Sequence, residues 1–238
     1  MNREQILTNI PRVTESGVTW EQPPQKVRRR PLLVRFAFFV VSLAVLLVLP
    51  FAVLVRVSAF LYIEHNAQTW LALAGGVVAT ALVLTLYSAV VSKKLTGKAR
   101  VRVLSKRVAF PLVLAYCVYT LLYLSSVNAK SIEVREYYRS LHPMLRITVS
   151  TMILVDRDIV ITDAHRSPED YAAMGLPPQR ESLHYRQDDG FVHAMDLRTV
   201  GRPEWRNSVV QLYFRIAGFE TLRHVGTADH LHVALPVK

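Results

Sequence analysis

The run FAFFVVSLAVLLVLPFAVLV, residues 36–55, sets the architecture of this chain because it carries no charged side chain. An α-helix needs about 20 such residues to cross the hydrocarbon core of a bilayer. Two more runs, Gln68–Ser92 and Val108–Asn128, also lack Asp, Glu, Lys and Arg. The sequence therefore predicts a region of three transmembrane helices within residues 32–128, at about 36–55, 70–91 and 108–127.

The polar stretch before the first run argues against a cleaved signal peptide. A signal peptide places a short apolar core near Met1 and ends at a small-residue cleavage site. Here a polar segment that contains Pro23 and Pro24 comes first. We therefore expect the first span to be retained, with residues 1–31 as a basic cytoplasmic tail.

The formal net charge of +11 is concentrated beside the apolar runs. Basic residues cluster within residues 26–35 and 93–107, whereas residues 56–69 hold one, and the chain after Val127 has fourteen Lys or Arg against fourteen Asp or Glu. This is the positive-inside pattern, which predicts a cytoplasmic N-terminus and loop 93–107 and an outer C-terminal part. Anionic lipid accounts for the basic clusters, so we expect membrane lipid and no nucleic acid as a partner.

The composition after Asn128 is that of a globular domain, residues 129–238. Helical spacing of apolar residues predicts one or two helices, β-branched or alternating stretches predict strands, and a second amphipathic stretch ends at Gly218. The predicted elements are helices within 130–155 and at 208–217 and strands at 159–162, 191–197 and 231–235. Cys117 is the chain's one cysteine, so no intramolecular disulfide can stabilise this compact α+β domain.

Five histidines lie between His184 and His232, among acidic residues. Neutral imidazoles with carboxylates are the usual ligands of zinc. Side chains alternate along a strand, so His230 and His232 would share one face of the predicted final strand. Composition alone does not choose the ligands.

Three stretches appear in an order that is similar to a known family. They are ITDAHRSP (161–168), then ESLHY (181–185) with AMDL (194–197), then AGF (217–219) with DHLHV (229–233). Together they resemble the motifs of the zinc D-Ala-D-Ala carboxypeptidase and hedgehog fold, and they cover most of the outer domain. The resemblance does not extend to the membrane region.

The resemblance implies a zinc site held by His184, Asp196 and His232. A catalytic zinc has three protein ligands and one open position, and two His with one Asp is a common set. His184 and Asp196 are separated by more residues than in the family, so residues 186–190 are expected to form an extended hairpin tip. His193 is a rival ligand, but it would face away from Asp196 on a regular strand, which favours His184.

The same resemblance implies catalytic roles for three further residues. Asp229 stands where the family carries the acidic base before its last ligand, Arg166 would hold a substrate carboxylate, and His230 would orient substrate or stabilise an oxyanion. Asp replaces the Glu of many relatives, and His165 stands where an aromatic residue is common.

The expected function is a membrane-anchored zinc carboxypeptidase or endopeptidase. It would hydrolyse D-amino-acid-containing peptides of peptidoglycan, such as stem peptides ending in D-Ala-D-Ala, from the outer face of a bacterial inner membrane. The alternative is a non-hydrolytic zinc domain that binds cell-wall peptides and scaffolds or signals, since a fold does not fix a function. The sequence leaves the cleaved bond open.

Overall fold

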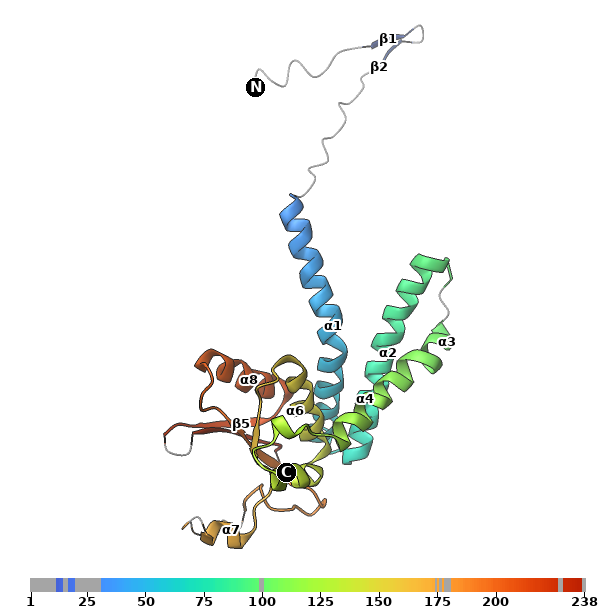
Figure 1. Ribbon diagram of the computed structural model, residues 1–238. Coiled ribbons are helices and arrows are strands. Elements are labelled where there is room, and N and C mark those ends of the chain that lie inside the picture. Colours follow the sequence, from blue (N-terminus) through green and yellow to red (C-terminus); the bar gives the residue numbers. More distant parts are fainter. Residues whose placement is uncertain are drawn as a thin grey trace. The chain divides into compact units, whose positions relative to one another are not determined.

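Helices make up most of the chain, and a small antiparallel sheet lies in its C-terminal half (Figure 1). The computed structural model describes residues 31–98, 101–173, 175, 177, 181–226 and 229–236, and the backbone of two short strands, β1 (Arg12–Thr14) and β2 (Gly17–Thr19). The rest of the predicted tail lies outside these residues. The chain divides into two units, residues 1–45 and 46–238.

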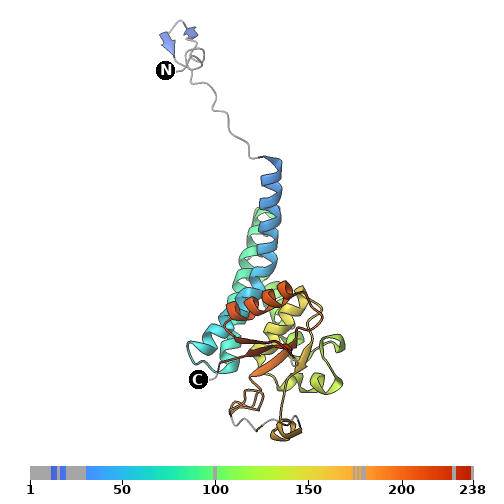
Figure 2. The same ribbon diagram turned by 90° about the vertical axis from the view of Figure 1, so that its left-hand side faces the viewer.

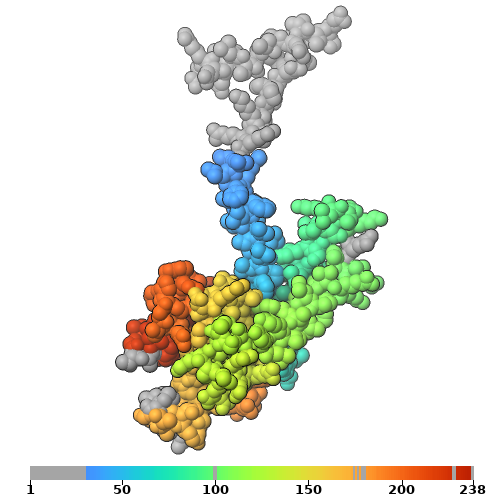
Figure 3. All heavy atoms as spheres, in the orientation of Figure 1, coloured from blue at the N-terminus to red at the C-terminus, as the bar shows by residue number. Residues whose placement is uncertain are grey.

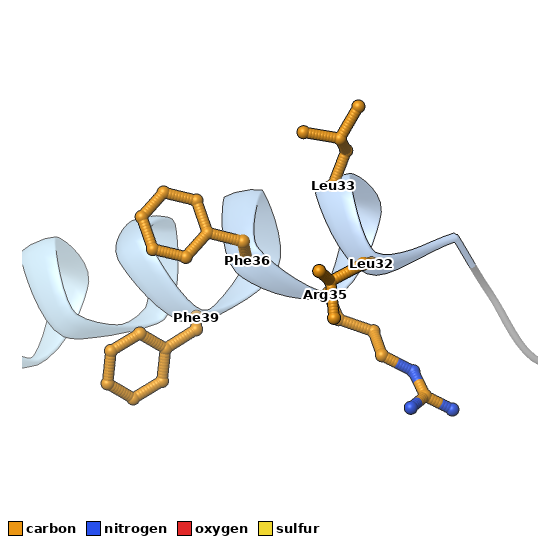
Figure 4. A pocket seen from close by; sticks show the side chains of 5 residues that line it. All are labelled: Leu32, Leu33, Arg35, Phe36 and Phe39. Atoms are coloured by element: carbon orange, nitrogen blue, oxygen red, sulfur yellow. The ribbon is translucent and has the colours of Figure 1, made fainter.

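Two helices are long and apolar enough to cross a membrane: α1 (Leu32–Ile63) has 32 residues and α2 (Thr69–Thr96) has 28. Only 17% and 28% of their most apolar windows are buried, whereas the core helix of a soluble protein is mostly buried. In the first turns of α1, Leu33, Phe36 and Phe39 project outward and are 63–81% exposed (Figure 4). Apolar helices therefore exist at the first two predicted spans, with wider bounds than predicted.

The third predicted span, 108–127, contains a shorter α-helix, α4 (Phe110–Leu122), of 13 residues. Helical backbone precedes it in α3 (Val101–Leu104) and in the π-helical turn η2 (Ser105–Ala109), which carry basic side chains. After Leu122 the chain leaves the helix before a 3₁₀ turn, η3 (Ser126–Asn128). A span needs about 20 apolar residues, so the described residues contain two candidate spans and the prediction of three is not confirmed.

Short helices and strands follow η3, as expected for an α+β domain. They are α5 (Ile132–Tyr137), η4 (Tyr138–Ser140), α6 (Pro143–Val155), β3 (Ile161–Asp163), α7 (Pro168–Ala173), β4 (Ala194–Arg198), α8 (Glu204–Ala217), β5 (Glu220–His224) and β6 (His230–Ala234). The strands pair antiparallel in the order β3-β4-β6-β5. The predicted helices and strands are present with shifted ends, whereas α7 and β5 were not predicted.

Helix α8 covers one face of the sheet, and α7 lies on the opposite side (Figures 1 and 2). Leu231 and Val233 of β6 point toward the α8 side, where they are buried with Phe214 of α8. Helix α8 ends at Gly218, which adopts a φ of 105° and donates its N–H to the Arg215 carbonyl, as predicted for the closing glycine. One sheet face is thus core, and the other is left for polar side chains.

Helix α6 joins the sheet to α1, α2 and α4 in one continuous core. Every residue of α6 from Pro143 to Met152 is buried, so this helix is covered on all sides. Polar contacts link α6 to its neighbours: Tyr138 Oη lies 2.8 Å from Ser150 Oγ of α6 and donates to the Thr120 carbonyl of α4, and Tyr213 Oη of α8 donates to the Thr148 carbonyl of α6. The segment after α4, drawn yellow-green in Figure 3, covers the centre of the face shown. The unit 46–238 therefore extends across the boundary expected at residue 129.

Candidate metal centre

Strand pairing brings Asp196 and His232 together. Asp196 of β4 lies directly opposite His232 of β6, and Arg198 lies opposite His230. Because side chains alternate, Asp196, His232 and His230 share the sheet face that points away from α8. This confirms that His230 and His232 lie on one face.

His184 reaches the same face from the loop before β4. Its carbonyl accepts the N–H of Arg166 at 3.1 Å, and its own N–H donates to Ser182 Oγ at 3.3 Å. Ser182 is held in turn by Tyr171, whose hydroxyl lies 2.8 Å from Ser182 Oγ. These contacts hold the loop in place, and His184 is only 3% exposed.

The three expected ligands converge. His184 Nε2 lies 3.3 Å from His232 Nδ1 and 3.4 Å from Asp196 Oδ1, and His232 Nδ1 lies 2.8 Å from Asp196 Oδ1. Two ligand atoms of a tetrahedral zinc ion lie about 3.3 Å apart, given metal–ligand distances of about 2.0–2.1 Å. The donor set and its spacing fit one zinc ion, and these residues form one of the two groups suited to a metal in the described part of the chain.

Arg166 is bound to two carboxylates of the protein. Its Nη2 donates to Asp196 Oδ2 at 2.7 Å, and its Nε donates to Asp163 Oδ2. Burial alone would raise the pKa of Asp196, but hydrogen bonds from His184 and His232, together with the electrostatic effect of His184 and His230, outweigh it, and the pKa lies well below its usual range. Asp196 is thus anionic at neutral pH, with Oδ1 directed at the histidines. Arg166 was expected to bind a substrate carboxylate, whereas here it binds Asp163 and Asp196 of the protein itself.

His230 lies beside the cluster and is partly exposed. Its Nε2 lies 3.7 Å from Asp196 Oδ1, and its side chain is 22% exposed. The ring stacks on His224 of β5, with centroids 4.5 Å apart. Burial, followed by the nearby His230, lowers the pKa of His224. Sequence reasoning missed His224 because it missed β5, although a histidine at that position pairs directly with His230.

Asp229, the expected base, is not brought to the three expected ligands. Its carboxylate accepts hydrogen bonds from Thr199 Oγ1 and Arg223 Nη1, which lower its pKa. Arg223 also approaches Glu204 of α8, at 3.4 Å. Asp229 is separated from His232 by three positions, and alternation along the strand therefore turns it to the α8 side.

His193 also lies outside this cluster. The chain between Arg186 and Val192 forms the expected hairpin: the two residues form a bridge, and Gln187 N donates to the Phe191 carbonyl at 2.8 Å. His193 follows the hairpin and contacts Asp189 and His142 instead. The structure thus brings His184, and not His193, to Asp196 and His232.

A groove of about 480 Å³ adjoins Arg166. Its lining includes Lys130, Tyr137, His165 and Asp170, which supply charges of both signs. His165, which stands where an aromatic residue is common in the family, stacks on Tyr137 with ring centroids 4.8 Å apart. The groove offers room for an extended polar ligand next to the cluster.

No protein-family model, curated protein or solved structure matches this chain. The peptidase resemblance therefore rests on its three motifs. The function is argued below from the geometry of the site and from the charge and hydropathy of the helices.

Proposed function

We propose that this protein is a membrane-anchored, zinc-dependent peptidase. The observation that carries the proposal is the convergence of His184 Nε2, His232 Nδ1 and Asp196 Oδ1 on the polar face of the sheet. Three ligands are the number that a catalytic zinc site has, with the fourth position left for water or substrate. The 26% exposure of the His232 side chain supports an open position on that side.

Within this proposal, each residue of the site has a distinct task. A bound zinc ion would act as a Lewis acid and lower the pKa of a water molecule. Arg166 keeps Asp196 ionised and fixes its orientation through Oδ2. His230, on the open side of the cluster, is placed to accept a proton and pass it to a leaving nitrogen.

The anchor would place this site outside the cytoplasm. The apolar and exposed α1 and α2 support insertion into a bilayer, and the basic clusters at 26–35 and 93–107 support a cytoplasmic N-terminus. The helical segment from Val101 to Leu122 would complete a third crossing, so that the sheet lies on the outer side. There, the resemblance points to peptidoglycan peptides that contain D-amino acids, and the groove beside Arg166 would receive them.

A second candidate is a zinc domain that binds such peptides without cleaving them. Two observations favour it: Asp229 lies away from the ligands, and Arg166 is already paired with Asp163 and Asp196. On this reading His230 and His224 line a recognition surface.

Hydrolysis by the full-length chain in detergent micelles separates the two functions. The protein would be stripped with a chelator, reloaded with zinc and incubated with purified muropeptides, and the products would be analysed by mass spectrometry. We expect cleavage that requires zinc and is lost in His232→Ala. Zinc-loaded protein that binds muropeptides without cleaving them would establish the binding function instead.

A further inference from the structure

A second group of metal-ligand side chains includes a residue of the 186–192 hairpin. It consists of His142 just before α6, Asp189 in the hairpin and His193 just before β4. His193 Nε2 lies 2.9 Å and His142 Nε2 lies 3.5 Å from the same oxygen, Asp189 Oδ2. This group shares no residue with the His184 cluster.

The two histidines of this group are buried, and its carboxylate has no basic residue beside it. The side chains of His142 and His193 are 0% and 1% exposed, so both imidazoles are shielded from water. Asp189, at 31% exposure, has these two rings as its ion-pair partners, and no Lys or Arg in the described part of the chain lies within 4.0 Å of its carboxylate. Asp196, in contrast, is balanced by Arg166. The group thus brings one carboxylate oxygen and two buried imidazoles together with no Arg or Lys beside the carboxylate, and these donors are ones that a zinc-type cation takes.

Aromatic rings form an apolar shell around the group. Tyr62 of α1 and Phe191 of the hairpin lie against His142, with centroids 4.7 Å and 5.6 Å away. Thr69, the first residue of α2, places Oγ1 2.9 Å from His142 Nε2. Such a shell shields ligands from water and holds their orientation, while the partly exposed Asp189 leaves an entry path.

The competing explanation is that hydrogen bonds alone, without a metal, hold these three side chains together. Met144 N–H donates to His142 Nδ1 at 3.3 Å, so without a metal the proton of this ring is on Nε2, directed at Thr69 or Asp189. A metal at Nε2 would leave the ring proton on Nδ1, so His142 could no longer accept the N–H of Met144. That bond is a single long one, whereas a bound cation would be held by all three side chains at once.

We propose that His142, Asp189 and His193 bind a second divalent cation of the zinc type. Because Tyr62 and Thr69 belong to α1 and α2, an ion at this position would fasten the hairpin of the globular part to the ends of the two apolar helices. This inference does not depend on the proposed peptidase activity.

Zinc content of the full-length chain in detergent micelles tests the second site. After chelation, re-equilibration with zinc alone and desalting, we expect two zinc ions per chain in the wild type and one in Asp189→Asn and in His193→Gln. The neighbouring Asp188→Asn is the matched control and should keep both ions, because Asp188 is exposed on the same hairpin. His232→Ala should also bind one ion, and His232→Ala with Asp189→Asn should bind almost none.

The possible outcomes separate the two sites. One zinc ion in the wild type and in Asp189→Asn, with none in His232→Ala, would overturn the second site and leave the His184 cluster intact. Two ions in His232→Ala would remove that cluster from zinc binding without touching the second site. The asparagine keeps the shape and an acceptor oxygen, so melting curves in chelator should coincide for wild type and Asp189→Asn. A variant that melts lower even in chelator, with two ions still bound, would make Asp189 structural and overturn the proposal.

Discussion

At the scale of single residues, Asp196 organises the candidate metal centre. One carboxylate oxygen faces the histidines and the other accepts a hydrogen bond from Arg166, so the two oxygens have different surroundings. Arg166 is in turn oriented by Asp163. A chain of charge-assisted hydrogen bonds of this kind holds a ligand in one rotamer before any metal arrives.

His230 and Asp229 are adjacent but should differ in their effect on catalysis. On the proposed function, His230→Gln should lower turnover by about 10²–10⁴ with zinc content unchanged, because the general acid–base group is lost. Asp229→Asn should keep both zinc and most of the turnover, since its carboxylate lies on the opposite face of the sheet. Zinc content and the hydrolysis rate of a D-Ala-terminated peptide would be measured for both variants. A large loss of turnover in Asp229→Asn alone would reinstate Asp229 as the base.

Asp156 should contribute to stability and not to chemistry. This carboxylate, at the C-terminal end of α6, accepts hydrogen bonds from Arg202 and Arg206. Asp156→Asn should lower the free energy of unfolding by about 2 kcal/mol, since the largely buried Arg202 loses its charged partner. Melting temperature in detergent would measure this. The control is Asp158→Asn, whose side chain is 66% exposed and whose effect should stay within about 0.5 kcal/mol.

The contribution of Asp156 to the stability of the fold depends on pH. Burial would raise the pKa of Asp156, but the hydrogen bonds from Arg206 and Arg202 outweigh it, so the pKa in the folded protein is lowered. Its stabilising contribution is therefore fully present above the unfolded-state pKa of about 3.9 and is lost as the pH falls below it. The difference in melting temperature between wild type and Asp156→Asn should shrink between about pH 5 and pH 3. A constant difference over that range would show that the charge on Asp156 is not what stabilises the fold.

At the scale of elements, α6 and the C-terminal end of α8 connect the sheet to the apolar helices. Helix α6 has no exposed face over most of its length, although its sequence contains Arg146 and several hydroxyl residues. Arg146 Nη1 donates to the Leu121 carbonyl at 2.6 Å, so its charge is directed to the end of α4. Local periodicity does not reveal a helix that is covered on every side.

Gly218→Ala should destabilise the contact between α8 and α1. Gly218 has a φ of 105°, and a Cβ there would lie 3.1 Å from Arg56 Nη1 and 3.4 Å from Ile63 Cδ1. We expect a loss of about 1–2 kcal/mol from the left-handed backbone, and a further loss from the crowding. The matched control is Gly201→Ala, where φ is 80° and no atom lies within 4 Å of the added Cβ. If the melting temperature falls equally in the two variants, the α1 atoms near Gly218 do not add to the destabilisation.

At the scale of the whole molecule, the apolar core crosses from the helices into the sheet. Leu54 of α1, Ala72 of α2 and Val113 of α4 belong to the same buried cluster as Leu145 of α6 and Val233 of β6. The contacts of α6 with α2 and α4 make the unit from residue 46 onward one folded body.

A fragment that begins at Ala129 should not fold as a stable soluble domain. Removing α1, α2 and α4 would expose the side of α6 that these helices cover, and a large exposed apolar patch promotes aggregation. We expect the fragment to be insoluble, or to unfold at a much lower temperature than the full chain. Size-exclusion chromatography and circular dichroism would measure both properties. A monomeric fragment with the full chain's melting temperature would contradict this view of the core.

Membrane topology is a separate prediction at this scale. From the charge bias we expect a reporter that is active only in the cytoplasm to be silent when fused after Lys238 and active when inserted in loop 93–107. Activity after Lys238 but not in the loop would mean the reverse orientation. Activity at both positions would mean that the segment from Val101 to Leu122 does not cross, and would remove cell-wall peptides as the substrate.

The sequence predicted those features that depend on neighbouring residues. Uncharged runs located α1 and α2, and alternation placed His230 with His232. The hairpin tip at 186–190 and the ligand group of His184, Asp196 and His232 came from the family resemblance. Strand register explains part of that group: β4 and β6 pair residue by residue, so Asp196 lies opposite His232 on the same face of the sheet.

The remaining features depend on contacts between distant parts of the chain. Strand β5, whose side chains are half exposed and mostly polar, gave no apolar pattern, so His224 was missed. Asp229 was assigned from the family resemblance, but Thr199 and Arg223 hold it on the other face. His142 and Asp189 meet His193 only because α6, the hairpin and β4 converge beside α1 and α2. Sequence spacing constrains side chains within one element, whereas clusters drawn from several elements form only when the tertiary core brings those elements together.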